Sequence, residues 1–303
     1  MNTNLDYKAN AALRAQKTSK IINKALVYGF LTLIAIFILI PFYWMLNISL
    51  QTTEQVLWST TPGLFPQPFA PENFVNVFTT AGRTGMTFWN FLANTLIVAF
   101  FSTTIGVLFA IIIAFALARL NFKGKNLLFL LLLATMMIPS EMFLITNVQT
   151  IFMLGWRRAD GIGSFFAMII PGTVSVFQVF LLRQSFKQIP NELYLAAKVD
   201  GCKDFKYLWT VMVPMAKSSI VTILILRIMS SWNSFMWPQM VAHERFRLLT
   251  AWLRTSFIDD ELGVTAMNLQ MAATAAVTIP LLILFIFARK YIMSGISRSG
   301  VKG

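Results

Sequence analysis

Side chains able to perform nucleophilic, acid–base or metal chemistry are scarce in this sequence. The chain has one cysteine, Cys202, and one histidine, His243. A single histidine makes a histidine-built metal site or a Ser-His-Asp triad hard to assemble, and Cys-His chemistry needs this distant pair to meet. The one Gly-Lys pair, Gly124-Lys125, is followed by Asn126, so it does not complete the phosphate-binding motif that ends in Gly-Lys-Ser/Thr. We therefore expect a chain that is not an enzyme, binds no metal or cofactor and does not itself hydrolyse ATP.

Other polar residues lie within or beside long apolar runs, where polar groups are costly and often functional. The candidates for a substrate path are Arg227, Ser231, Trp232, Asn233, Asn94 and Glu141. The guanidinium, hydroxyl and amide groups suit sugar hydroxyl groups, and the indole suits stacking on a sugar ring. A packing role is the alternative, in which Arg227 pairs with Glu141 or binds a backbone carbonyl and the serines let helices approach. Both interpretations stay open from the sequence.

The elements that position these residues follow from the composition. Of 303 residues, 57% are hydrophobic and 12% are charged, and the mean hydropathy is +0.68. These values exclude an ordinary soluble domain and indicate a chain largely embedded in lipid. A net charge of +13 suggests nucleic acid binding in a soluble protein. In a membrane protein, basic loops on one side of the bilayer explain the charge, and we expect no nucleic acid partner.

Six apolar stretches are long enough to cross a hydrocarbon layer of about 30 Å, which needs about 20 residues per helix. They cover about residues 25–46, 91–117, 127–145, 165–182, 220–240 and 269–288. Pro41, Pro139, Pro171, Pro238 and Pro280 fall within or at the ends of these stretches. Since neighbouring helices can absorb kinks, the sequence predicts an all-α membrane protein with six transmembrane helices.

Basic residues predict the orientation of these helices. Most Lys and Arg outside the apolar stretches lie before residue 25, around residue 120, in the polar segment at about 187–217, and after residue 288. By the positive-inside rule, these segments and both termini are cytoplasmic. We thus expect a basic tail at 1–24, a six-helix transmembrane domain at 25–290 and a second cytoplasmic tail at 291–303.

The segment at about 187–217 is a polar island between two apolar runs. Pro190 ends the preceding run, Asn191 is a plausible helix N-cap, and Glu192 falls in the first turn. Gly201 is suited to a left-handed stop, after which Pro214 closes a second short helix before the fifth apolar run. The pattern fits an elbow that transmits a push into the membrane helices. An ordinary loop with an Ala-rich helix is the alternative.

The island resembles the EAA loop of ATP-binding cassette (ABC) importer permeases. The matching pattern is Ala-Ala, three residues, Gly, nine residues, and then an aliphatic residue, any residue, an aliphatic residue and Pro. The residues that the resemblance assigns to ATPase docking are Glu192, Leu195, Ala196, Ala197, Asp200, Gly201 and Pro214. In this chain Leu195 stands where the family has Glu immediately before Ala-Ala, and Glu192 is the nearest acid.

Further segments resemble the maltose-type, carbohydrate-importing branch of that family. They are Asn90 to Asn94, Met137-Ile138-Pro139, Ser231-Trp232-Asn233 with Trp237-Pro238, and the ending Gly300-Val301-Lys302-Gly303. Together with the loop, they extend the resemblance over about residues 25–303. The ending is similar to a family tail that contacts the ATPases.

This resemblance implies a type I ABC importer permease fold in the bacterial plasma (inner) membrane. It also implies a second, different permease subunit, two ATPase subunits that carry ATP and magnesium, and an extracytoplasmic solute-binding protein that delivers sugar. A permease for a polyol or glycerol phosphate is an alternative of the same class. A proton-coupled carrier or membrane enzyme is an alternative of another class, and needs a relay of intramembrane His, Asp or Glu, for which only Glu141 is a candidate.

Overall fold

A computed structural model of the chain describes residues 3–58, 63–79, 85–157, 162–258 and 265–297. Within these ranges the chain is helical and forms no β-strand. The α-helices are α1 (Thr3–Ser49), α2 (Thr53–Trp58), α3 (Glu72–Thr79), α4 (Phe88–Arg119), α5 (Lys125–Thr135), α6 (Leu144–Met153), α7 (Gly163–Ile169), α8 (Val176–Lys187), α9 (Asn191–Val199), α10 (Asp204–Tyr207), α11 (Val213–Met215), α12 (Lys217–Trp232), α13 (Met236–Val241), α14 (Leu249–Thr255) and α15 (Met267–Ser297). The 3₁₀-helices η1 (Ser140–Phe143) and η3 (Glu244–Phe246) and the π-helix η2 (Leu208–Met212) complete the set.

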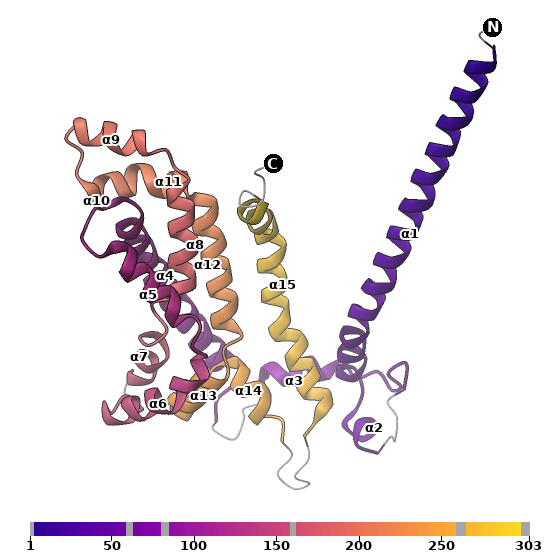
Figure 1. Cartoon of the computed structure of the whole chain (residues 1–303). Coiled ribbons are helices and arrows are strands. Elements are labelled where there is room, and N and C mark those ends of the chain that lie inside the picture. Colours follow the sequence, from indigo (N-terminus) through magenta and orange to yellow (C-terminus); the bar gives the residue numbers. More distant parts are fainter. Residues whose placement is uncertain (1–2, 59–62, 80–84, 158–161, 259–264, 298–303) are drawn as a thin grey trace.

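The helices give the molecule two distinct ends (Figure 1). The α9–α10 segment lies at one end, the same end toward which the N-terminal part of α1 and the C-terminal part of α15 point. The short helices α2, α3, α6, α13 and α14 lie at the opposite end. The two terminal helices and the polar island therefore share one end, as the distribution of Lys and Arg predicts.

Three uninterrupted helices have the length and hydropathy to cross a membrane. These segments are Gln16–Ser49, Phe88–Arg119 and Met267–Arg289. They contain the predicted first, second and sixth apolar stretches, so the prediction of long apolar helices is confirmed there. Pro41 and Pro280 lie inside α1 and α15 without ending them.

The third and fourth predicted stretches are broken rather than straight. α5 and the segment from η1 to α6 meet at 86°, and Pro139 lies at the break. Pro171 lies between α7 and α8 and divides the fourth stretch. Proline lacks a backbone N–H and disfavours helical geometry in the residue before it, which explains why each helix stops there.

The fifth stretch follows a bend and is broken before its end. The helical segment Asp204–Met215 meets Lys217–Trp232 at 82°, just before the predicted start at residue 220. α12 ends at Trp232, short of the predicted end at residue 240, and α13 follows after a break. By length and composition, the described residues thus give three spanning helices, or five when each bent pair counts as one.

The core of the bundle is α4, which packs against α8 and α12. Near the α9–α10 end, the small residues Ala110 and Ala114 of α4 are buried among Leu182 and Phe186 of α8 and Ile223 of α12. Small side chains at this contact let the helix axes approach closely. Toward the other end, an aromatic cluster of Phe88, Phe91, Trp232 and Trp252 packs against small residues of α15.

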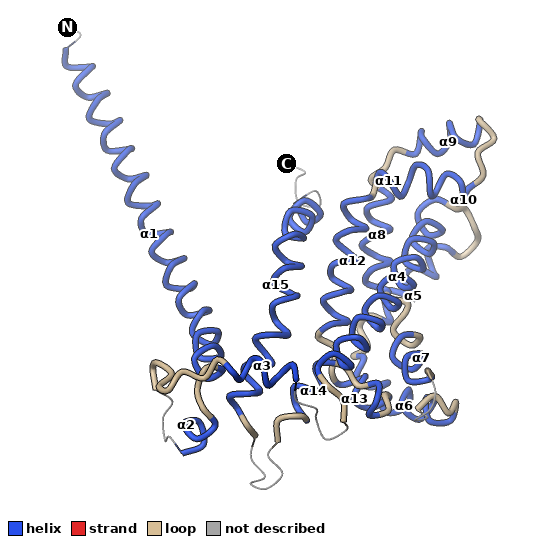
Figure 2. Tube along the Cα trace, turned by 180° about the vertical axis from the view of Figure 1, so that it is seen from behind, coloured by secondary structure: helices blue, strands red, loops and turns tan. Residues whose placement is uncertain are grey.

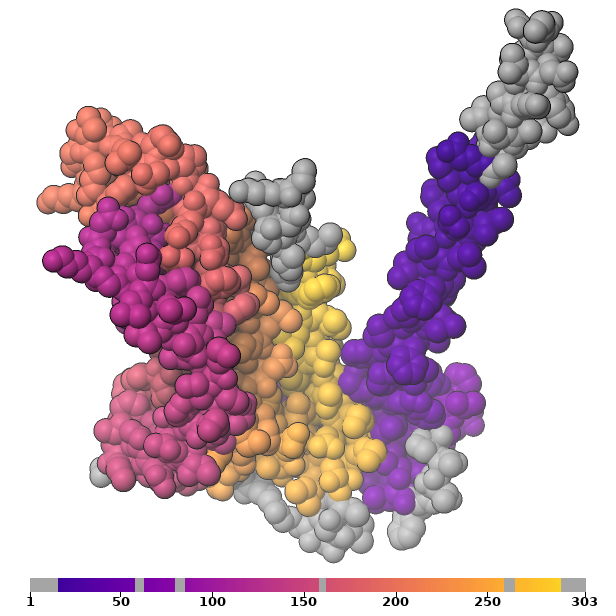
Figure 3. Space-filling model, in the orientation of Figure 1, coloured from indigo at the N-terminus to yellow at the C-terminus, as the bar shows by residue number. Residues whose placement is uncertain are grey.

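α1 is attached to the bundle only through its C-terminal end. Both views of the trace show most of this helix standing apart from α4, α8 and α12 (Figures 1 and 2), and the space-filling view shows it projecting from the molecule (Figure 3). None of its most apolar window is buried within the chain. Its apolar surface therefore faces lipid or another protein.

Amide side chains tie the end of α1 to an ordered cap. The Nδ2 of Asn73 on α3 donates to the carbonyl oxygens of Ser49 and Gln51 at 2.9 and 2.8 Å. The Nδ2 of Asn268 on α15 donates to the same Gln51 carbonyl at 3.2 Å. Since all four residues are buried, these hydrogen bonds fix α1, α3 and α15 relative to one another.

Candidate functional site

The polar island folds into a helical elbow, defined here as α9, α10 and η2. α9 runs from Asn191 to Val199, and Gly201 follows it with φ of 72°. The backbone N–H of Cys202 then donates to the carbonyl of Ala197 at 2.8 Å. Glycine adopts this left-handed conformation at little cost, which confirms the predicted stop at Gly201.

Asp204 connects the two arms of the elbow. Its Oδ1 accepts a hydrogen bond from the hydroxyl of Tyr194 at 2.6 Å and lies 2.7 Å from Nζ of Lys198. The hydrogen bond to Asp204 raises the pKa of Lys198, and burial together with the same carboxylate raises the pKa of Tyr194. Tyr194 also meets the ring of Tyr207 edge-on, with 5.1 Å between centroids. These contacts hold α9 against α10.

The paired alanines of the elbow point in different directions. Ala197 packs against the core cluster that α4, α8 and α12 share, whereas Ala196 is exposed. On the exposed side, Leu195 and Val199 have exposed fractions of 56% and 88%, and Phe205 of α10 has 66%. The structure thus uses one alanine for packing and leaves the other on an apolar outer surface.

Arg119, at the end of α4, fastens the elbow to the bundle. Its Nη1 donates to Oδ1 of Asn191 at 3.1 Å, and its Nη2 donates to the carbonyl of Phe186 at 2.9 Å. The sequence predicted Asn191 as a helix N-cap. That N-cap prediction is wrong, since the N-cap position is Pro190 and the Asn191 side chain serves Arg119. For the contact between Arg119 and the elbow, the only signal in the sequence was a basic residue at the end of an apolar stretch.

Pro214 lies where the elbow becomes the fifth apolar stretch. It follows the π-helix η2 and falls within the three-residue α11, ahead of the 82° bend. Because proline provides no N–H, the regular α-helical ladder cannot continue through this position. The predicted boundary at Pro214 is thus part of a continuous but strongly bent helical path.

Arg227 lies buried at the centre of the bundle, with an exposed fraction of 6%. Its Nε donates to the carbonyl of Ser102 at 2.8 Å, its Nη1 to Oε1 of Gln178 at 2.9 Å, and its Nη2 to the carbonyl of Gly172 at 2.6 Å. Gly106 makes room for the guanidinium, because a Cβ added there would lie 2.1 Å from Cζ of Arg227. The structure therefore joins Arg227 to α4, α8 and the break before α8.

Other candidates for the substrate path also have partners within the chain. The Nδ2 of Asn94 donates to the carbonyls of Arg245 and Arg247 at 3.0 and 3.1 Å. The hydroxyls of Ser102 and Ser231 lie 3.4 Å apart, and Trp232 is buried in the aromatic cluster. These contacts bring α4, α12 and the segment before α14 together.

Two candidates are exposed. Asn233 follows α12, and its Nδ2 donates to the carbonyl of Met229 at 2.8 Å. Glu141 accepts a hydrogen bond from the hydroxyl of Ser140 at 3.1 Å and does not pair with Arg227. Gly300, Val301, Lys302 and Gly303 lie outside the described residues. Within the described residues, no three His, Cys, Asp or Glu gather into a group that could hold a metal ion.

Long apolar helices around a tightly packed α4, with a polar elbow braced at one end, define a multi-pass membrane protein. The chain belongs to the family described as binding-protein-dependent transport system inner membrane component, whose model matches residues 106–298. This family relationship makes the chain an inner-membrane transport subunit rather than an enzyme. ABC permeases of this family carry no cofactor of their own.

Two curated relatives and one solved structure span nearly the whole chain. The arabinooligosaccharides transport system permease protein AraQ of Halalkalibacterium halodurans is 29% identical over 293 residues, which cover 95% of this chain and 99% of that protein. The probable ABC transporter permease protein MG189 of Mycoplasma genitalium is 29% identical over 306 residues, covering 98% and 94%. A bacterial ABC transporter involved in the import of the acidic polysaccharide alginate has a chain with a TM-score of 0.75 and 22% identity, covering 92% and 98%. That likeness confirms the importer permease fold.

Proposed function

We propose that this chain forms half of the translocation pathway of an ATP-driven sugar importer and takes mechanical work from a separate ATPase through its elbow. The observation that carries the proposal is an exposed apolar surface on a braced element: Leu195, Val199 and Phe205 are exposed, while Asp204 and Arg119 fix the element beneath them. The similarity to the arabinooligosaccharides permease AraQ supports a sugar as the cargo.

The apolar surface gives the elbow a way to dock without the family's usual acid. Leu195 and Val199 lie one turn apart, so their side chains share one side of α9. Burying a leucine-sized side chain completely contributes about 1.5–3 kcal/mol. Glu192 and Asp200 are exposed nearby and add negative charge at the edge of this surface. We assign the ATPase contact to Glu192, Leu195, Ala196 and Asp200, with Ala197, Gly201 and Pro214 holding the shape.

The ATPase partners supply the nucleotide-binding sites of the importer. ATP and magnesium bind to two ATPase subunits, one of which receives this elbow and the other the elbow of a different permease subunit. The ending Gly300-Val301-Lys302-Gly303 provides a second contact with the ATPases. The end of the bundle that holds the elbow, the start of α1 and the end of α15 is then cytoplasmic, with both termini inside.

At the opposite end, the cap and the segments around α13 and α14 receive a sugar-loaded binding protein. Asn233 and Glu141 are exposed and remain candidates for contacting cargo. Arg227, Ser231, Trp232 and Asn94 set the positions of the helices that border the path, because their polar or aromatic groups contact other parts of the chain. The second permease supplies the remaining wall.

Cross-linking from the elbow tests the docking. The chain carrying Cys202→Ser is reconstituted with its partner permease, ATPases and binding protein, and a cysteine is placed at Ala196. A short cross-linker should join this cysteine to an ATPase subunit. A matched cysteine at Ser140, exposed outside the elbow, should give no such product. Absence of an ATPase product from Ala196 in an importer that still transports would refute the assignment.

The identity of the cargo is tested separately. The purified binding protein is titrated with oligosaccharides, polyols and glycerol phosphate, and its best ligand is then used in uptake assays with vesicles containing the whole importer. A sugar that binds and enters only with ATP supports the proposal. Selective uptake of glycerol phosphate would instead establish the alternative importer, and uptake without the ATPases would establish a secondary carrier.

A further inference from the structure

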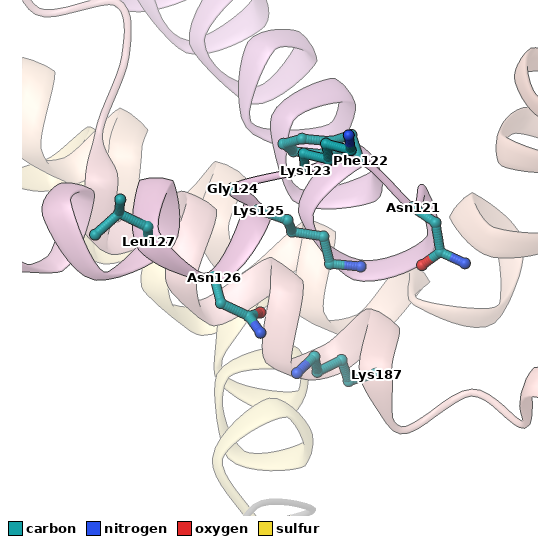
Figure 4. Close-up of a pocket in the computed structure, with 8 residues that line it drawn as sticks. All are labelled: Asn121, Phe122, Lys123, Gly124, Lys125, Asn126, Leu127 and Lys187. Atoms are coloured by element: carbon teal, nitrogen blue, oxygen red, sulfur yellow. The ribbon is translucent and has the colours of Figure 1, made fainter.

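A basic pocket of about 730 Å³ lies near the elbow, between the start of α5 and the end of α8 (Figure 4). Its lining residues are Asn121, Phe122, Lys123, Gly124, Lys125, Asn126, Leu127 and Lys187. Gly124, with φ of 81°, turns the chain from the end of α4 into α5. The turn brings lysines from two separate parts of the sequence around one cavity that has no acidic residue in its lining.

The lysines of this pocket have donors to spare. Within the described residues, Lys123 and Lys187 form no hydrogen bond or ion pair through their side chains, and Lys125 donates to the carbonyl of Leu120 at 2.8 Å. An ammonium group has three N–H donors, so Lys125 keeps two. The pocket therefore presents several cationic donors to whatever enters it.

Two arginines behind the pocket increase its positive charge. Arg119 and Arg183 are close enough to act on Lys125 electrostatically. Both are already engaged, because Arg119 binds Asn191 and Arg183 donates to the carbonyl of Leu117 at 3.1 Å. They raise the positive electrostatic potential of the pocket but are not among the residues that line it. Like charges collected in this way repel one another, and an anion in the pocket relieves that repulsion.

An apolar surface continues directly from the pocket along α5. No described side chain of α5 is buried, and Leu127, Leu130 and Leu131 have exposed fractions of 61%, 62% and 56%. α5 is tied to the bundle on its other side, where the guanidinium of Arg183 lies 3.7 Å from the ring centroid of Phe129. A ligand suited to the whole feature has an anionic head and a hydrocarbon part.

We propose that this pocket binds the phosphate group of an anionic phospholipid, whose acyl chains lie along Leu127, Leu130 and Leu131. Basic pockets between membrane helices at the cytoplasmic surface are suited to such headgroups, since Lys and Arg near an anionic membrane surface attract its negative charge. Free phosphate shares the head chemistry but gains nothing from the leucines. Because Arg119 braces the elbow beside this pocket, the bound lipid anchors the elbow at the membrane surface.

The test measures lipid retention by the full-length chain. The purified protein is exposed to phosphatidylglycerol or phosphatidylcholine in detergent, and bound lipid is counted by native mass spectrometry. We expect preferential retention of phosphatidylglycerol, and about fivefold or greater weakening in K123Q/K187Q. The matched control K20Q/K24Q removes the same charge from exposed positions on α1 and should retain the lipid. The conservative K123R/K187R variant should also retain it.

Three results would overturn the proposal. Equal retention of the two lipids would show that the pocket does not select an anionic headgroup. Equal losses in K123Q/K187Q and K20Q/K24Q would show a general effect of surface charge. Binding of inorganic phosphate in the absence of lipid, with full displacement of phosphatidylglycerol, would assign the pocket to free phosphate.

Discussion

Replacing Gly106 with alanine should disrupt the buried cluster around Arg227. The added methyl group would lie 2.1 Å from Cζ and 2.4 Å from Nη2 of Arg227, far inside contact distance. The guanidinium must therefore move, and it cannot keep its hydrogen bonds to Ser102, Gln178 and Gly172 as it does so. The helices that those acceptors belong to lose their common partner.

The expected loss follows from the hydrogen bonds alone. An interhelical hydrogen bond in a membrane protein contributes about 0.6–1.7 kcal/mol, so losing all three lowers the free energy of unfolding by about 2–5 kcal/mol. Gly29 supplies the control, because it also lies in a long helix and an added Cβ there meets nothing within 4 Å. Gly29→Ala should leave stability unchanged or slightly higher, since alanine favours helix.

A double-mutant cycle isolates the cause. Unfolding of purified protein is followed by SDS titration in mixed micelles for Gly106→Ala, Arg227→Ala and the double variant. Gly106→Ala should cost less than about 1 kcal/mol when Arg227 is already alanine, because the clash is then absent. An equal cost in both backgrounds, or no cost in the native background, would refute the account of Gly106 as space for the guanidinium.

Three further predictions concern the elbow. Ala196→Arg should leave the protein folded and abolish the ATP hydrolysis that sugar-loaded binding protein stimulates. Ala197→Arg should instead make the elbow sensitive to protease, because Ala197 packs against the core whereas Ala196 is exposed. Identical behaviour of the two variants would contradict these different orientations. Gly201→Val should lower the free energy of unfolding by at least about 1–2 kcal/mol, and Gly201→Asn by less. The space around Gly201 is open, so the cost comes from its positive φ rather than from a clash. Unfolding midpoints of the two variants measure this difference. Asp204→Asn removes the ion pair with Lys198 and should speed hydrogen exchange in α9. Unchanged exchange would show that Asp204 does not brace α9.

Local sequence signals predicted the elbow well. Pro190 and Gly201 both act on the backbone within one or two residues, so a helix between them follows from chain chemistry without knowledge of its neighbours. The observed helix, Asn191–Val199, agrees with that reasoning, whereas the second helical segment runs past Pro214 to Met215 before it bends. Apolar length likewise predicted α1, α4 and α15.

Partners of buried polar groups could not be predicted in the same way. Arg227 finds its acceptors 125 and 55 positions away in the sequence, at Ser102 and Gly172. Glu141 was the only carboxylate within the predicted apolar stretches. The helix break at Pro171 frees the Gly172 carbonyl for Arg227, so the partner exists only because a predicted straight helix is broken. Such contacts depend on tertiary packing, which periodicity does not encode.

The brace formed by Arg119 has a mechanical consequence. One side chain on α4 grips both the end of α8 and the beginning of α9, while Asp204 locks α9 to the arm that runs into α12. A force applied to the outer side of α9 is thus distributed over α4, α8 and α12 rather than bending one helix. The elbow is therefore stiff where it meets the bundle, and a push on α9 moves the ends of α4, α8 and α12 together.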